Sequence, residues 1–159
     1  MTAHQPTGSD TAKEEFSLDG YLPQMLNMTV ASMNERLAAE LKTIGLSVPH
    51  WRILAIVHWL GTSTLSEIQQ KTVIDTSTLS RSIKRLEVDG LVVRAWSAKD
   101  SRARAIALTP EGEAVFKKGW RIVSRFYAYI FEDLDPASRT TMFRALETVQ
   151  QRLGRSYWY

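Results

Sequence analysis

The chain has 159 residues, of which 44% are hydrophobic and 23% charged, and its formal net charge at pH 7 is +3. This composition is typical of one globular domain and excludes a disordered or fibrous chain. Because the chain has no cysteine, disulfides, thiolate metal sites and cysteine redox switches are also excluded. No apolar run reaches the roughly 18 residues that cross a membrane, and the N-terminus lacks the pattern of a secretory signal, so we expect a cytoplasmic protein without a membrane partner.

Positive charge is concentrated in the middle third of the chain. Residues 71–104 hold 8 basic and 4 acidic side chains, whereas residues 1–70 hold 4 basic and 7 acidic side chains. A basic surface attracts polyanions. The middle third is therefore where we expect a polyanion to bind.

The predicted elements begin after a polar leader, residues 1–15, which we expect to be mobile. From about Gly20, large apolar residues recur at helical spacing and predict a long first helix that ends at Gly45. Pro49 lies at the first turn of a second helix, which contains "HWRILAIVHWL" and ends at Gly61. Because this second helix is apolar nearly all round, it is expected to be buried.

A helix-turn-helix is predicted next. Thr64 and Glu67 have the spacing of a capping box and predict a short helix over residues 65–71. Asp75, or the threonine after it, can cap the following helix, and Gly90 is well placed just past its end. Two helices joined by a turn such as "TVID" are typical of a helix-turn-helix.

Two strands and two helices complete the chain. Residues 91–96 and 102–109 are predicted to be strands joined by the turn "SAKDS". Because side chains alternate along a strand, one face of the second strand is basic at its tip and apolar at its base. A capping residue followed by proline, at Thr109 and again at Asp135, then begins each of two further helices.

The predicted helix that ends before Gly90 has an apolar and a polar face. Leu79, Ile83 and Leu86 share the apolar face. The opposite face carries hydroxyls and cations, the groups with which a helix in the DNA major groove contacts bases and phosphates. These residues are Ser77, Arg81 and Lys84, with Ser80 and Arg85 beside them. For this helix taken alone, an ordinary solvated basic face is the alternative.

The basic hairpin that follows this helix favours DNA binding. A hairpin in this position can reach a neighbouring minor groove, where the negative potential favours arginine. Lys99, Arg102 and Arg104 supply the cations, and Asp100 is close enough in sequence to Arg102 to brace its guanidinium. A surface hairpin with scattered charges is the alternative.

Three segments resemble the MarR family of bacterial winged-helix regulators. "DSRARAIALTPEG" resembles the wing signature of that family, "STLSRSIKRLEVDGLVVR" its recognition helix and first wing strand, and "LSVPHWRIL" the start of its second helix. The resemblance covers about residues 46–112. It implies a mainly α fold with a small β-hairpin wing, in which a winged helix-turn-helix DNA-binding lobe (49–108) lies between an N-terminal dimerisation helix (16–48) and C-terminal dimerisation helices (109–159).

The resemblance also implies a homodimer in which the long helices interlock and each lobe reads half of a palindromic operator in double-stranded DNA. The apolar stripes of the long helices support a dimer independently, because a monomer would leave large apolar patches exposed. By their place in the family's motifs, the residues that face bases or lie in the wing are Ser77, Thr78, Ser80, Arg81, Asp100 and Arg102.

A small-molecule effector is a further implication of the resemblance. Family members commonly release DNA when an aromatic or phenolic compound, or its coenzyme A thioester, binds between the dimerisation helices and the DNA-binding lobe. "IDTSTLSRSIKRL" and "PHWRIL" are most similar to regulators of aromatic acid catabolism. Candidate walls of the effector site, for which a plain hydrophobic core is the alternative, are Met25, Met28, Trp51, Trp59, Phe116 and Trp120.

Arg52 interrupts the apolar second helix. A guanidinium among apolar neighbours needs an anionic partner. That partner is either an internal Asp or Glu or the carboxylate or phosphate of an effector, which arginine suits geometrically. His58 in the same helix is interpreted as a core or dimer-interface histidine.

The sequence does not predict an enzyme. It contains no recognisable zinc motif, glycine-rich phosphate loop or nucleophile elbow, so no metal or cofactor is expected. We therefore expect a DNA-binding repressor that is released by a ligand. The alternatives are a DNA-binding regulator without an effector and a winged-helix module that contacts proteins.

Overall fold

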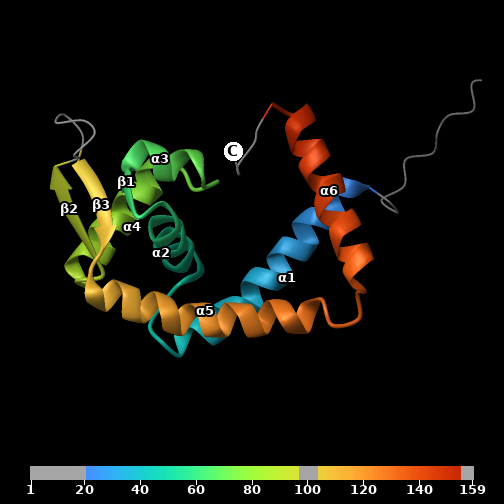
Figure 1. Ribbon diagram of the computed structural model, residues 1–159, viewed down its shortest axis with the longest axis horizontal. Coiled ribbons are helices and arrows are strands. Elements are labelled where there is room, and N and C mark those ends of the chain that lie inside the picture. The colour runs from blue at the N-terminus through green and yellow to red at the C-terminus, as the bar shows by residue number, and fades with distance from the viewer. Residues whose placement is uncertain (1–20, 97–103, 155–159) are drawn as a thin grey trace, which may run out of the picture. The chain divides into compact units, whose positions relative to one another are not determined.

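The computed structural model describes residues 21–96 and 104–154 (Figure 1). The chain divides into two compact units, residues 1–33 and 34–159. Helix and strand follow one another in the order α1 (Leu22–Lys42), α2 (Val48–Leu60), β1 (Thr62–Thr64), α3 (Leu65–Gln70), α4 (Thr76–Val88), β2 (Val92–Trp96), β3 (Arg104–Leu108), α5 (Pro110–Ile130) and α6 (Pro136–Arg152). The expected fold, mainly α with a β-hairpin wing, is confirmed. None of the described helices is long and apolar enough to cross a membrane.

Local capping explains where the helices begin. Thr64 and Glu67 form the predicted capping box: the Thr64 hydroxyl accepts from the Glu67 backbone N–H at 3.2 Å, and the Glu67 carboxylate accepts from the Thr64 N–H at 2.7 Å. At the start of α5, Thr109 Oγ1 accepts from the Gly112 N–H at 2.9 Å. Caps of this kind stabilise a helix by about 1 kcal/mol each.

The sheet has three strands, whereas the sequence predicted two. All pairs are antiparallel in the order β1-β3-β2, so β3 is central. As a central strand β3 buries neighbouring residues, Ala105 at 3% and Ile106 at 2% exposure. The sequence predicted that one face of this strand is basic at its tip and apolar at its base. That prediction is incomplete, because both faces of the strand are covered at Ala105 and Ile106.

Helix α2 lies at the centre of the second unit, where it packs against α4, α5 and β3. Its expected burial holds for Val48, Trp51, Ile53, Leu54 and Val57. It is wrong for Trp59, which is 59% exposed and whose ring lies 5.7 Å from the Lys71 ammonium. The core around α2 is completed by Ile68, Leu79, Ile83, Leu86 and Val92.

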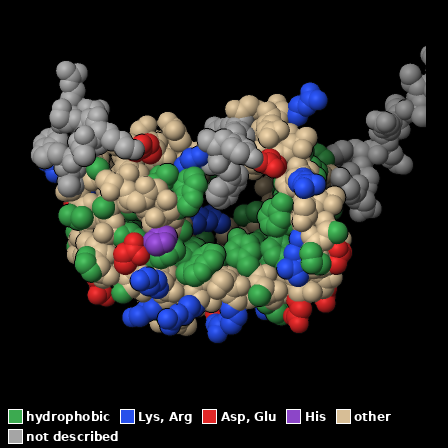
Figure 2. Space-filling model, viewed as in Figure 1, with side chains coloured by type: hydrophobic (Ala, Val, Ile, Leu, Met, Phe, Trp, Pro, Cys, Tyr) green, Lys and Arg blue, Asp and Glu red, His purple; other side chains and the backbone are tan. Residues whose placement is uncertain are grey.

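Helix α5 is amphipathic, and Figure 2 shows hydrophobic side chains along one side of it and lysine and arginine side chains along the other. Its buried side packs on α2, where the rings of Phe116 and Trp51 stack 5.3 Å apart. Helix α6 has no buried residue. Phe143 on α6 contacts Phe131 at 5.9 Å between ring centroids, and large apolar side chains of α6 stay exposed on the single chain.

Candidate nucleic-acid interface

Helix α4 is fixed by its own first turn. Asp75 is the N-cap, and its Oδ1 accepts from the Thr78 backbone N–H at 2.9 Å and from the Ser77 hydroxyl at 2.6 Å. These hydrogen bonds from Ser77 and Thr78 hold the pKa of the Asp75 carboxyl well below its usual range. Because the carboxylate stays ionised, the first turn of α4 is held in place at neutral pH.

The inner face of α4 is packed and its outer face is open. Leu79, Ile83 and Leu86 are completely buried, as the sequence predicted. The outer face is exposed or half-buried and carries Ser77, Thr78, Ser80, Arg81, Lys84 and Arg85. The predicted separation of hydroxyls and cations from the apolar face is therefore present in the structure.

The cations on the outer face differ in their local partners. Arg81 lies back along the first turn, where its Nη2 donates to Thr78 Oγ1 at 3.3 Å. Arg85 pairs with Asp89 at 3.0 Å, which offsets its charge. Lys84 is exposed, and no carboxylate within residues 21–96 or 104–154 pairs with it. Lys84 and Arg81 are therefore the cations best placed to reach a polyanion.

The strand hairpin is tied to α4. Arg94 on β2 lies 3.2 Å from a carboxylate oxygen of Glu87 on α4. Arg104, one of the predicted wing cations, begins β3 and is exposed. Lys99, Asp100 and Arg102 lie outside the described residues. The salt bridge between β2 and α4 holds the base of the hairpin against the helix.

The predicted effector walls differ in their burial. Trp51 and Phe116 are brought together, at 5% and 9% exposure. The remaining candidates are more than half exposed, namely Met25, Met28, Trp59 and Trp120.

His58 is not a core residue of the single chain, so the first alternative for it is wrong and the dimer-interface alternative stays a prediction. Its side chain is 41% exposed, and its Nδ1 lies 3.0 Å from a carboxylate oxygen of Glu113 on α5. The His58 ring also stacks on Phe116, with 3.9 Å between ring centroids. This contact joins α2 to α5, and it was missed because the two residues are far apart in sequence.

Arg52 has a partner that the sequence did not predict. Its Nη2 donates to the amide oxygen of Asn34 at 2.8 Å. Among the residues that the structure describes, no carboxylate pairs with Arg52. The expectation of an internal Asp or Glu is therefore wrong for this part of the chain, and a neutral side chain takes that place.

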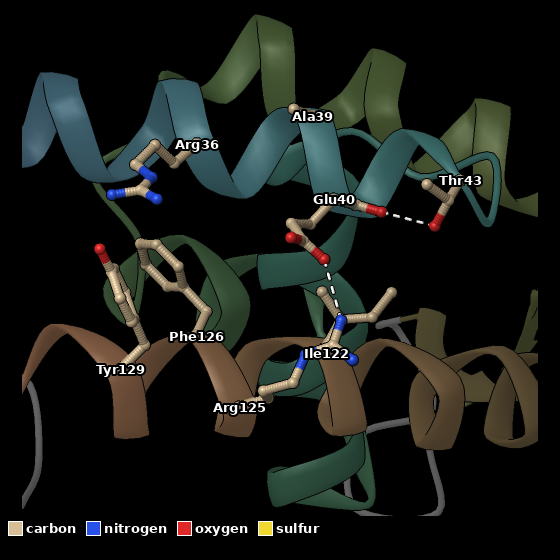
Figure 3. Close-up of a pocket in the computed structure, with 8 residues that line it drawn as sticks. All are labelled: Arg36, Ala39, Glu40, Thr43, Ile122, Arg125, Phe126 and Tyr129. Atoms are coloured by element: carbon tan, nitrogen blue, oxygen red, sulfur yellow. Dashed lines mark hydrogen bonds and ion pairs between the residues drawn. The ribbon is translucent and has the colours of Figure 1, made fainter. Parts of the chain in front are cut away.

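A hollow of about 580 Å³ lies between α1 and α5 (Figure 3), and the sequence did not predict it. Arg36 places its guanidinium 4.9 Å from the centre of the Tyr129 ring, and Arg125 pairs with Glu40 at 3.0 Å. The spacing of four between Arg36 and Glu40, and between Arg125 and Tyr129, was a signal that each pair shares a helix face. It could not show that the two faces meet.

Replacing Asp75 by alanine is expected to destabilise the chain by removing the cap of α4, while asparagine, whose amide oxygen still accepts, should cost less. The hydrogen bonds hold the pKa of Asp75 below its ordinary value of 3.8. The stabilisation by the ionised carboxylate is thus complete above about pH 5 and is lost as the pH falls below about 4. Urea unfolding of both variants between pH 3 and 7 measures the stability that the Asp75 carboxylate contributes. If the loss of stability in Asp75→Ala is as large at acid pH as at pH 7, the ionised carboxylate is not the source of that stability.

Comparison with known proteins places these features in a family. Residues 44–103 match the MarR family. The HTH-type transcriptional repressor IacR of Pseudomonas putida is 30% identical over 150 residues, which are 94% of this chain and 87% of that protein. The homoprotocatechuate degradative operon repressor of Escherichia coli is 27% identical over 110 residues, which are 65% of this chain and 74% of that protein. Both relatives are named as transcriptional repressors, which is the class of function that the sequence predicted.

A solved structure agrees with the fold. The crystal structure of a MarR-family transcriptional regulator from Silicibacter pomeroyi is 29% identical, matches 86% of this chain and 92% of its own, and has a TM-score of 0.76. The matched residues 44–103 begin just after α1 and include α2, β1, α3, α4 and β2. The chain therefore belongs to the MarR family of winged helix-turn-helix transcriptional regulators.

Proposed function

We propose that the chain is a homodimeric repressor that binds a palindromic operator and is released by a small aromatic or phenolic ligand or its coenzyme A thioester. The observation that carries the DNA-binding part is the outer face of α4, where hydroxyls and cations stand on a helix whose inner face is fully buried. Such a helix can enter the major groove without disturbing its own packing. Its place of action is the cytoplasm.

The proposed division of the chain follows from this function. Residues 49–108 form the DNA-binding lobe, residues 16–48 and 109–159 supply the dimerisation helices, and residues 1–15 are a leader. The proposed DNA contacts are Ser77, Thr78, Ser80, Arg81, Lys84 and Arg85 on α4 and Lys99, Asp100, Arg102 and Arg104 in the wing.

Exposed apolar side chains support the dimer. Phe143 on α6 is 55% exposed, Leu153 at the C-cap of α6 is 75% exposed, and Trp120 on α5 is 55% exposed. Large apolar side chains on several helices favour an interface, and a two-fold axis lets both chains bury the same patch. Two lobes related in this way read half-sites that lie about one DNA turn, roughly 34–36 Å, apart.

The ligand class is supported by one of the relatives. The Escherichia coli protein is named as the repressor of a homoprotocatechuate degradative operon, and homoprotocatechuate is an aromatic acid. An aromatic acid can release DNA only if it binds the DNA-competent and incompetent states of the protein unequally.

Anisotropy of a labelled fragment from upstream of the chain's own gene tests the proposal. We expect tight binding whose logarithm falls linearly with the logarithm of salt concentration, because each neutralised phosphate releases counterions. We expect one member of a panel of aromatic acids and their coenzyme A thioesters to release the protein from the DNA fragment. Selective binding that no compound relieves supports a regulator without an effector, and weak binding without sequence preference supports a module for protein contacts.

A further inference from the structure

We infer that Gln69 sets the direction in which α4 leaves the turn after α3, and that it thereby decides how selectively the chain reads its operator. The inference rests on the proposed reading of bases by α4, to which it adds a positioning residue. Gln69 is half-buried near the end of α3. Its side-chain Nε2 donates to the carbonyl oxygen of Ile74 at 2.7 Å. This hydrogen bond ties the end of α3 to the residue just before the N-cap of α4.

Hydrogen bonds fix the main chain on both sides of Ile74. Its N–H donates to Thr72 Oγ1 at 3.1 Å, and its carbonyl oxygen accepts from Gln69. The carbonyl of the next residue, Asp75, is the first one that α4 itself uses, since it accepts from the Leu79 N–H at 2.8 Å. Rotation of the main chain at Ile74 therefore breaks at least one of the bonds that hold the turn.

Apolar packing alone does not fix the angle of α4. The buried face of the helix, Leu79, Ile83 and Leu86, holds it against the core, but the hydrophobic effect has no direction. The residues near the start of a recognition helix contact base edges, and such side chains must be held to within about 0.5 Å of their working position. The hydrogen bond from Gln69 acts immediately before that start, so it controls where the first turn of α4 lies.

The Gln69 side chain is expected to add little to the stability of the chain. Its Oε1 is buried, and among the residues that the structure describes it has no hydrogen-bond partner. A buried oxygen without a partner costs at least as much free energy as one hydrogen bond contributes. The gain at Nε2 is therefore offset at Oε1, and what remains is the direction that the bond to Ile74 imposes.

Anisotropy with the Gln69→Met variant tests the inference. Selectivity is the affinity for the fragment from upstream of the chain's own gene divided by the affinity for a scrambled duplex of the same length. We expect Gln69→Met to lower selectivity at least about fivefold, the effect of one lost hydrogen bond. Its binding to the scrambled duplex should stay within about twofold, because phosphate contacts carry no sequence information. The matched control is Gln70→Met, the same change at the exposed neighbour, which should keep selectivity within about twofold.

Hydrogen exchange of the full chain without DNA tests the hold of Gln69 on α4 separately. The Thr78 amide, which donates to Asp75 Oδ1 at the start of α4, is expected to exchange at least about fivefold faster in Gln69→Met. The Asp89 amide, which donates to Arg85 O at the other end, should exchange at an unchanged rate. A local change of this kind distinguishes a loosened turn from a general loss of stability.

Three results overturn the inference. They are a selective wild type with equally selective Gln69→Met, an equal loss of selectivity in Gln70→Met, and faster exchange at both ends of α4 with a lower urea midpoint, which would make Gln69 merely structural. If the wild type prefers neither duplex, the proposed function fails and the effect on selectivity fails with it. Faster exchange at Thr78 alone would in that case still support the hold of Gln69 on α4.

Discussion

Replacing Gly112 by alanine is expected to destabilise the chain by at least about 3 kcal/mol, the upper part of the range for overpacked sites. A Cβ at this position would lie 1.9 Å from the carbonyl oxygen of Leu91. The contact is with backbone, which cannot rotate away as a side chain can. The start of α5 cannot easily retreat either, because the Thr109 N–H donates to Leu91 O at 3.1 Å and its hydroxyl donates to Gly90 O at 2.6 Å.

Urea unfolding at a fixed protein concentration measures this effect, since a dimer makes stability depend on concentration. Gly45→Ala is the matched control, because Gly45 has a φ of +75° but no atom within 4 Å of an added Cβ. It should cost only about 1–2 kcal/mol, the strain of a left-handed backbone. A loss for Gly112→Ala no larger than for Gly45→Ala would contradict the close approach of α5 to Leu91.

The beginnings of the helices were predictable from the sequence because capping is local. Thr64, Asp75, Thr109 and Asp135 each cap a helix through hydrogen bonds that span two or three residues. A window of a few residues holds all the information for such a contact. The starts of α3, α4, α5 and α6 therefore followed from local signals.

Strand β1 could not be predicted in the same way. Thr62–Thr64 is short and polar and shows no alternation, and it is a strand only because it pairs with β3. Its partners, such as Ala107 opposite Thr62, lie far away in sequence. Pairing over such a distance is decided by the whole fold and not by the propensity of the segment.

In the candidate site, too, features within one helix were predictable and contacts between helices were not. The polar face of α4 was predictable because the period of 3.6 residues places Arg81 and Lys84 opposite Leu79 and Ile83 whatever the rest of the chain does. The hollow at Arg36 was not, because it exists only where α1 meets α5. For Arg52 the sequence showed the need for a partner, but the choice of Asn34 over a carboxylate depends on how α1 packs on α2.

Replacing Arg81 by alanine is expected to relax base preference at one position of the operator half-site by about 1–3 kcal/mol, or roughly fivefold to more than a hundredfold in affinity ratio. Arg81 stands one turn from the start of α4, where its Nη2 bonds Thr78 Oγ1 at a long 3.3 Å. A bond of this length is readily exchanged for a base edge. Anisotropy with operators changed at single base pairs measures the preference.

Lys84→Ala separates base reading from phosphate contact. We expect it to weaken binding to all sequences alike and to lower the salt slope by about 1, because a lysine on phosphate carries no sequence information. Arg85→Ala is the matched control, since its charge is already offset by Asp89 at 3.0 Å, and its effect on the slope should be smaller. If Arg81→Ala changes neither affinity nor preference, α4 is not the recognition helix, and the basic middle of the chain must meet DNA through another face.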